Sequence, residues 1–183
     1  MPEKEIKKLK PFILWLTGIS NSGKTTISNE LEKKIKFMGY NNVKNIDGDN
    51  FRKKINNFSY DDYSRDKIGY IKLGKAKEHL IDGYSVIVSG IAYSKKWRKE
   101  IKLKCRELIE VYLKCSLNIC IERDKSGNYK KALEGKKKDF VGVAKKYEEG
   151  KTVDLEINTE KLTIDQSVEK IFQFLTKKKL LNE

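Results

Sequence analysis

Short apolar runs alternate with longer amphipathic stretches along the whole chain. The apolar runs predict five strands, and the amphipathic stretches predict a helix after each strand. This order is typical of an α/β fold with a mostly parallel sheet and helices on both faces. The predicted strands are Phe12–Thr17, Val43–Asp47, Tyr84–Ser89, Leu108–Lys114 and Val153–Ile157, and the predicted helices are Lys24–Met38, Asp62–Ile81, Lys95–Glu107, Leu117–Arg123 and Ile164–Lys178.

The first predicted strand runs into a glycine-rich turn with the pattern G-x-x-x-x-G-K-T at residues 18–25. Glycines let such a turn approach phosphates closely, and its amides and the following helix N-terminus form a nest for anions. Lys24 is expected to reach the β- and γ-phosphates, and Thr25 to hold Mg²⁺. The strand before and the helix after argue against an accidental lysine in an ordinary turn. We therefore predict an ATP or GTP site formed by Gly18, Ser20, Asn21, Ser22, Gly23, Lys24, Thr25 and Thr26.

The second predicted strand ends in Asp47-Gly48-Asp49-Asn50, with Arg52 two residues later. Carboxyl ends of parallel strands share one edge of the sheet, so these side chains are expected beside the phosphate loop. One carboxylate is suited to hold Mg²⁺ through water, and the other to orient or deprotonate an acceptor hydroxyl. Arg52 is suited to grip an acceptor phosphate. An ordinary Asp-Gly turn is the alternative, and spacing alone does not divide the roles between Asp47 and Asp49.

Composition narrows the class of protein. A length of 183 residues without repeats or linkers predicts a single domain over residues 1–183. The formal net charge is +14, but the lysines are spread along the chain. We therefore expect attraction of small anionic nucleotides rather than nucleic-acid binding. The chain has no membrane-length apolar run and no signal-peptide core. Its three cysteines form no metal-binding spacing, which favours reduced thiols in a cytoplasmic protein.

Residues 124–147 interrupt the alternation of strands and helices, because they are rich in glycine and lysine. A solvated charge run is one interpretation. A mobile lid that closes over phosphates and excludes water is the other, and a phosphoryl-transfer enzyme needs such a lid. Elsewhere, Trp97 and Arg98 follow the end of a predicted strand and are expected either to border an acceptor pocket or to lie on a solvated helix face. His79, the only histidine, is expected to be a surface or packing residue.

These motifs together resemble the adenylylsulfate (APS) kinase family over about residues 11–149. The resemblance implies the three-layer P-loop NTPase fold with a mobile lid. It also implies transfer of the γ-phosphate of ATP, with Mg²⁺, to the 3′-hydroxyl of adenosine 5′-phosphosulfate, and an enzyme that is often a homodimer. The matching segments are Leu14-Trp15-Leu16-Thr17-Gly18, Asp47-Gly48-Asp49-Asn50 with Arg52, Glu122-Arg123-Asp124, Tyr129-Lys130-Lys131-Ala132, Lys138-Asp139-Phe140 and Tyr147-Glu148.

The resemblance also implies residue roles. Arg123 is expected near the ATP base, and the lid residues Lys138 and Phe140 are expected to close on the acceptor nucleotide. Lys24, Asp47, Asp49 and Lys138 are the expected catalytic residues, with Thr25 and Asp47 on the metal. The expected substrate contacts are Arg52, Phe58, Arg65, Ile91, Ala92, Lys138 and Phe140.

The departures from the family pattern fall on the acceptor side. The His-Gly-Leu-Asn stretch gives way to residues 53–57, and Glu-Asn-Ile-Arg-Arg to residues 68–72, although Arg65 is a possible substitute for a lost arginine. Phe-Ile-Ser-Pro becomes Gly90-Ile91-Ala92-Tyr93. This pattern favours a working kinase with another acceptor, and cytidine diphosphoramidate, used in capsule synthesis, is preferred. Adenylylsulfate is the first alternative, and a non-catalytic nucleotide-binding regulatory module is the second.

Overall fold

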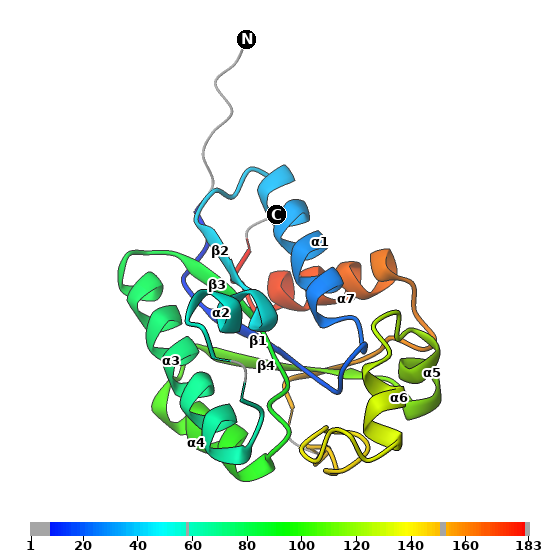
Figure 1. Cartoon of the computed structure of the whole chain (residues 1–183). Helices are drawn as coiled ribbons and strands as arrows, with labels where there is room; N and C mark the ends of the chain where they lie inside the picture. Colours follow the sequence, from blue (N-terminus) through cyan, green and yellow to red (C-terminus); the bar gives the residue numbers. More distant parts are fainter. Residues whose placement is uncertain (1–7, 58, 151–152, 182–183) are drawn as a thin grey trace.

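Five parallel strands run through the middle of the molecule in the order β2-β3-β1-β4-β5 (Figure 1). The structure is a computed structural model that describes residues 8–57, 59–150 and 153–181. β1 and β3 are buried at every position, since helices cover both faces of the sheet, and this explains their uninterrupted apolar sequences. The strands are β1 (Ile13–Thr17), β2 (Val43–Ile46), β3 (Ser85–Ser89), β4 (Leu108–Lys114) and β5 (Leu155–Asn158).

Two pairs of helices complete a three-layer sandwich. On one face, α1 (Lys24–Phe37) and α7 (Ile164–Lys177) pack on the sheet through apolar side chains such as Leu31 and Ile171. On the other face, α3 (Asp62–Ile81) and α4 (Lys95–Lys104) pack through Leu73 and Ile101. The predicted α/β fold is confirmed. Among the described residues, no helix is long and apolar enough to cross a lipid bilayer.

Two short helices were not predicted, and both border the region where the predicted site residues lie. α2 (Gly48–Lys54) begins directly after β2, because the Asp47 side chain accepts a hydrogen bond from the Asn50 amide and caps the helix. α6 (Asn128–Leu133) lies inside the predicted lid and follows α5 (Leu117–Glu122). α6 buries Tyr129 and Ala132, so this part of the lid is a packed element rather than a solvated charge run.

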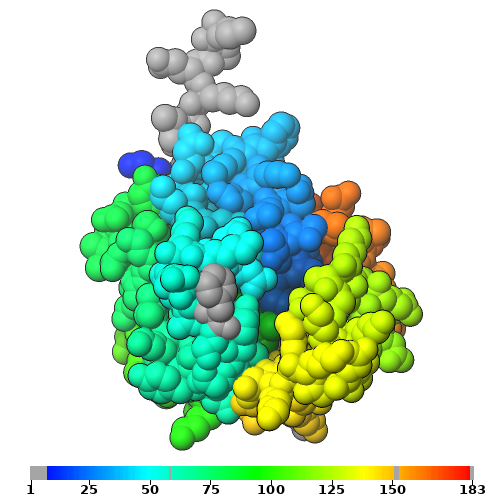
Figure 2. Space-filling view, viewed as in Figure 1, coloured from blue at the N-terminus to red at the C-terminus, as the bar shows by residue number. Residues whose placement is uncertain are grey.

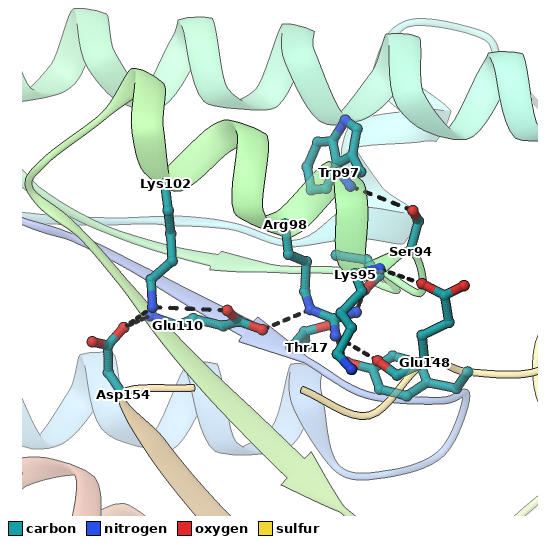
Figure 3. A network of polar contacts seen from close by, with 11 residues as sticks. Thr17, Ser94, Lys95, Trp97, Arg98, Lys102, Glu110, Glu148 and Asp154 are labelled. Carbon is teal, nitrogen blue, oxygen red and sulfur yellow. Dashed lines mark hydrogen bonds and ion pairs between the residues drawn. The ribbon is translucent and has the colours of Figure 1, made fainter. Parts of the chain in front are cut away.

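The expectation for Arg98 is wrong, because this residue is 3% exposed and contributes to neither a pocket nor a solvated face. Its Nε lies 2.7 Å from Glu110 Oε1 on β4, and its Nη1 donates to the Ala92 carbonyl at 2.6 Å (Figure 3). The guanidinium also donates to the Glu148 carbonyl. Arg98 therefore joins the strand, the segment after β3 and the end of the lid.

Trp97 is buried and lines a cavity, which agrees with the first of its two expected positions, at the border of a pocket, and not with a solvated helix face. It contacts Trp15 edge to face with a centroid distance of 5.4 Å, and Tyr70 at 5.9 Å. Gly69 permits this packing, because a Cβ there would lie 2.2 Å from the Trp97 ring. The aromatic contacts of Trp97 therefore depend on the absence of a side chain at position 69.

Candidate active site

The loop between β1 and α1 has the geometry of a phosphate nest. Gly18, Asn21 and Gly23 have positive φ angles of 148°, 58° and 96°. A Cβ on Gly18 would lie 2.7 Å from the Leu113 carbonyl oxygen, so only glycine fits there. Gly23 is the N-cap of α1 and no side chain caps the helix, which leaves the first amides of α1 directed into the loop.

Lys24, the first residue of α1, is held by the loop itself. Its Nζ donates to the Ile19 carbonyl at 2.5 Å and to Ser22 Oγ at 3.4 Å. Burial lowers the pKa of Lys24 to about 8, although the charges of Asp49 and Asp47 oppose that shift. A phosphate oxygen would raise this pKa again, because it offers the ammonium a charged partner.

Thr25 and Asp47 form the candidate metal position. Thr25 Oγ1 donates to Asp47 Oδ2 at 2.7 Å, and Ser89 Oγ donates to the same oxygen at 3.1 Å. Burial raises the pKa of Asp47, but the hydrogen bonds from Asn50, Thr25 and Ser89 outweigh it and hold the pKa below its usual value. Among the described residues, no group of three or more histidine, cysteine or acidic side chains is placed to hold a metal ion. One hydroxyl and one carboxylate fit Mg²⁺, which usually completes its shell with water and phosphate.

A cavity of about 630 Å³ opens above this loop. Arg123 lies at its edge, where its guanidinium donates to the Thr159 carbonyl at 2.8 Å. Thr159, Thr163 and Ser167 also line it, and these residues were not predicted. The Thr163–Gln166 capping box is a sequence signal that marks the start of α7, although it does not indicate a ligand. The predicted residues that line this cavity are Ser20, Asn21, Gly23, Lys24, Thr25, Thr26, Asp47, Asp49, Ile91 and Arg123.

A second, smaller cavity of about 60 Å³ adjoins the first, and both are lined by Gly48, Gly90 and Ile91. Arg52 and Arg65 bring two guanidinium groups to it. Asn57 Oδ1 accepts from Arg52 at 3.1 Å, and the Tyr60 carbonyl accepts from Arg65 at 2.6 Å. Ala92 also lines this cavity. We call the larger space the donor cavity and the smaller one the acceptor cavity.

The segment predicted to form a lid, residues 124–147, contacts both the phosphate loop and Arg65. Tyr129 donates to the Ser20 carbonyl of the phosphate loop at 2.8 Å, and its ring contacts Phe140 at 4.8 Å. The carbonyl of Asp139 accepts from Arg65 at 2.8 Å. Figure 2 shows the lid in yellow and the α2 segment in cyan on opposite sides of a hollow.

Among the described residues, four predicted site residues line neither cavity: Gly18, Ser22, Lys138 and Phe140. Lys138 is exposed and Phe140 is half-buried, and neither of these two described residues lines the donor or the acceptor cavity. Phe58 lies outside the described residues. Their roles stay predictions. Gly18 and Ser22 lie close together within the phosphate loop, since a Cβ on Gly18 would lie 2.7 Å from Ser22 Oγ, and Ser22 is fully buried.

A parallel α/β sandwich with a phosphate loop, a paired hydroxyl and carboxylate, and an adjoining cationic cavity defines a P-loop kinase. Comparison with known sequences gives the family: the sequence profile described as adenylylsulphate kinase matches residues 10–158. The chain belongs to the adenylylsulphate kinase family, and it is a phosphotransferase that acts on a hydroxyl group.

Similar proteins carry related names. The chain is 35% identical over 176 residues to an adenylyl-sulfate kinase of Staphylococcus haemolyticus, covering 94% of this chain and 87% of that protein. It is 37% identical over 169 residues to a probable adenylyl-sulfate kinase of Synechocystis, covering 88% and 92%. The Mycobacterium tuberculosis APS kinase CysC, solved with AMPPNP and APS, superimposes with a TM-score of 0.80 at 25% identity over 92% of this chain and 99% of that one.

Proposed function

We propose that the protein transfers the γ-phosphate of ATP to the 3′-hydroxyl of a nucleoside 5′-phosphoryl acceptor, with adenylylsulfate as the first candidate. The carrying observation is the junction of the two cavities, where a phosphate loop meets a pocket with two guanidinium groups. The names of the relatives favour adenylylsulfate over the acceptor preferred from sequence.

The donor side would act by positioning and charge stabilisation. Lys24 and the loop amides hold the β- and γ-phosphate oxygens of ATP and stabilise the charge that develops on them during transfer. Thr25 and Asp47 hold Mg²⁺, which neutralises phosphate charge when bound. Thr25 and Asp47 are already 2.7 Å apart, so little rearrangement is needed to bind the ion.

The geometry favours a division of work between the two aspartates. The Asp47 carboxylate already accepts hydrogen bonds from Thr25, from Ser89 and from the amide of Asn50 that it caps. Asp49 is exposed and lines the donor cavity, where its carboxylate is available to an incoming hydroxyl. We therefore assign Asp49 to orienting the acceptor 3′-hydroxyl and accepting its proton, and Asp47 to the metal.

Closure of the lid would complete the site. Asp139 is already joined to Arg65 through its carbonyl, and Lys145 lies 2.9 Å from the Asp139 carboxylate. Movement of the segment that follows α6 would bring Lys138 and Phe140 over the acceptor, exclude water and leave the hydroxyl as the nucleophile.

Cytidine diphosphoramidate is the second candidate acceptor. The observation that favours it is the altered acceptor side, where Ile68, Gly69 and Ala92 line the cavity and Gly69 packs against Trp97. These residues replace polar or larger ones in the family pattern, so the contacts to the acceptor change while the phosphate loop is kept.

A competition assay tests both candidates. With Mg·ATP and equal concentrations of adenylylsulfate and cytidine diphosphoramidate, we expect adenylylsulfate to give the higher kcat/KM. A large preference for the cytidine compound would assign the second function. No turnover with either, together with ATP binding, would point to a non-catalytic nucleotide-binding module.

The predictions on partners and location follow from this function. The partner is a small nucleotide rather than nucleic acid, and the reaction belongs in the cytoplasm, where ATP is abundant. A homodimer is expected from the family resemblance, and analytical ultracentrifugation of the purified protein tests it.

A further inference from the structure

Lys72 carries a buried ammonium group that no step of the proposed reaction uses. It lies on α3 seven residues after Arg65, and two helical turns place both side chains on the same face. The residue is 6% exposed and lines the acceptor cavity beside Trp15, whose ring centroid is 5.2 Å from Nζ. Lysine is seldom buried to this degree without an ion pair.

The ammonium has spare hydrogen-bonding capacity. Within the described residues it donates one hydrogen bond, to the Ser89 carbonyl at 3.2 Å, and no carboxylate lies within ion-pair distance. An ammonium has three donors, so two remain for a ligand. Burial, together with a smaller effect of the nearby charge of Arg52, lowers the pKa of Lys72 to about 8.

Gly90 leaves the space that this ammonium occupies, and Gly48 lies beside it. A Cβ on Gly90 would lie 2.4 Å from Lys72 Nζ, and a Cβ on Gly48 would lie 3.6 Å from it. Both glycines line the donor and the acceptor cavity. The cation therefore lies next to the junction of the two cavities.

The acceptor cavity has the size and charge for one small anionic group. Arg52, Arg65 and Lys72 line it, against one carboxylate, Asp66. The charge of Arg52 lowers the pKa of both Arg65 and Lys72, which indicates mutual repulsion that an anion would relieve. A volume of about 60 Å³ holds a few water molecules or one tetrahedral oxyanion, but not a nucleobase.

We propose that Lys72 is a specificity-determining residue that binds the terminal oxyanion group at the 5′ end of the acceptor nucleotide, together with Arg52 and Arg65. The proposal rests on the proposed kinase function and deepens it. It adds Lys72 as a third cation to the two guanidinium groups that face the 5′ end of the acceptor.

The test compares Lys72→Met with Lys75→Met, a control at an exposed lysine of the same helix that pairs with Glu78. For Lys72→Met we expect the KM of the acceptor to rise at least tenfold, while the KM of ATP stays within twofold. The dissociation constant of the matching nucleoside 5′-monophosphate, which lacks the terminal group, should change less than twofold. An acceptor KM equal to that of Lys75→Met, or an equal loss for the monophosphate, would overturn the proposal.

Folding and function are separated by two further measurements. The melting temperature of free Lys72→Met should equal or exceed that of the wild type, since the substitution removes a buried charge. A marked fall would instead support a structural role and count against the proposal. If the wild type turns over neither acceptor, the kinase function fails, and inorganic pyrophosphate is titrated into the complex with a non-hydrolysable ATP analogue. Weaker pyrophosphate binding by Lys72→Met supports the anion site, and unchanged binding overturns it.

Discussion

At the scale of single residues, Lys24 is the cation expected to stabilise the phosphate that is transferred. Replacing it with alanine removes the cation that stabilises the transferred phosphate, so kcat/KM should fall by a factor on the order of 10³ or more. The fold should remain. The substitution removes a buried charge and its desolvation cost, and the glycines that set the loop conformation are unchanged. Steady-state kinetics and circular dichroism measure the two effects. Lys33→Ala, at an exposed lysine of α1 that pairs with Glu30, is the matched control. Normal turnover of Lys24→Ala would refute the donor site.

Substitution of Asp47 and substitution of Asp49 should have different effects on the Mg²⁺ concentration that the enzyme requires. Asp47→Asn weakens the metal position, so it should raise the Mg²⁺ concentration needed for half-maximal rate about tenfold. Asp49→Asn removes the group that receives the hydroxyl proton, so it should lower kcat about 10²-fold or more at an unchanged Mg²⁺ requirement. Rate measurements over a Mg²⁺ series distinguish the variants. The reverse pattern would exchange the two roles.

At the scale of elements, the ion pair of Arg98 and Glu110 should hold α4 to β4. Both side chains are less than 10% exposed, at 4% and 7%. Arg98→Met leaves Glu110 without its main partner, and we expect a loss of about 3–5 kcal/mol in the free energy of unfolding. The double variant Arg98→Met with Glu110→Leu should recover part of this loss, because no buried charge is left unpaired.

Urea denaturation of the single and double variants measures these free energies. Lys104→Met breaks an exposed pair with Glu100 on the same helix and should change stability by less than about 1 kcal/mol. Additive losses at Arg98 and Glu110 would show that the two residues do not act as a pair.

The lid gives a second prediction at this scale. Lys138 and Lys136 are both exposed lysines just after α6, and Lys136 pairs with Glu134. If the lid closes on the acceptor, Lys138→Ala should lower kcat/KM for the acceptor about tenfold or more, while Lys136→Ala should change it less than twofold. Equal effects of the two substitutions would mean that Lys138 has no specific role.

Long periodic elements could be predicted from sequence, and so could the short helix α5, whereas the short helices α2 and α6 could not. Strand, turn and helix around Gly18 to Lys24 follow from apolar runs and glycines, and the structure has them. α2 has seven residues and α6 has six, and each lies in a segment with glycines and many charged residues, where no periodic apolar pattern can be recognised. Asp47 was predicted as the last residue of the second strand, and its role as the N-cap of α2 was missed, because the cap depends on a local hydrogen bond that the sequence does not reveal.

At the scale of the whole molecule, Lys72 links stability to pH. Its pKa is about 8 in the folded chain, against an ordinary value of 10.5. The folded state binds fewer protons between these two values, so the penalty for the buried charge is full below pH 8 and disappears as pH rises toward 10.5. The stability gained in Lys72→Met should therefore be largest below pH 8, roughly 3 kcal/mol or less, and should shrink by pH 10. Urea denaturation at pH 7 and pH 10 in phosphate-free buffer measures it, and a gain that does not depend on pH would contradict the shift.

The site was predictable where it follows from local sequence and unpredictable where it depends on packing. Thr25 and Asp47 lie at one edge of the sheet because each follows the carboxyl end of a parallel strand, β1 or β2, and that could be inferred. Arg98 and Lys72 could not be assigned, since a lysine or arginine in an amphipathic helix is indistinguishable from a solvated one until its neighbours are known. Glu110, the partner of Arg98, lies in a strand whose apolar pattern hides its single carboxylate.

The absence of a side chain at position 90 determines where the Lys72 ammonium can lie. Even the first carbon of a side chain at position 90 would lie 2.4 Å from Nζ, which is too close for both to stay in place. Because Nζ is the free end of a flexible side chain, it would move away rather than forbid the substitution. A side chain at position 90 would therefore displace the cation from the junction of the two cavities, so the two positions are tied to one another in any change of this part of the site.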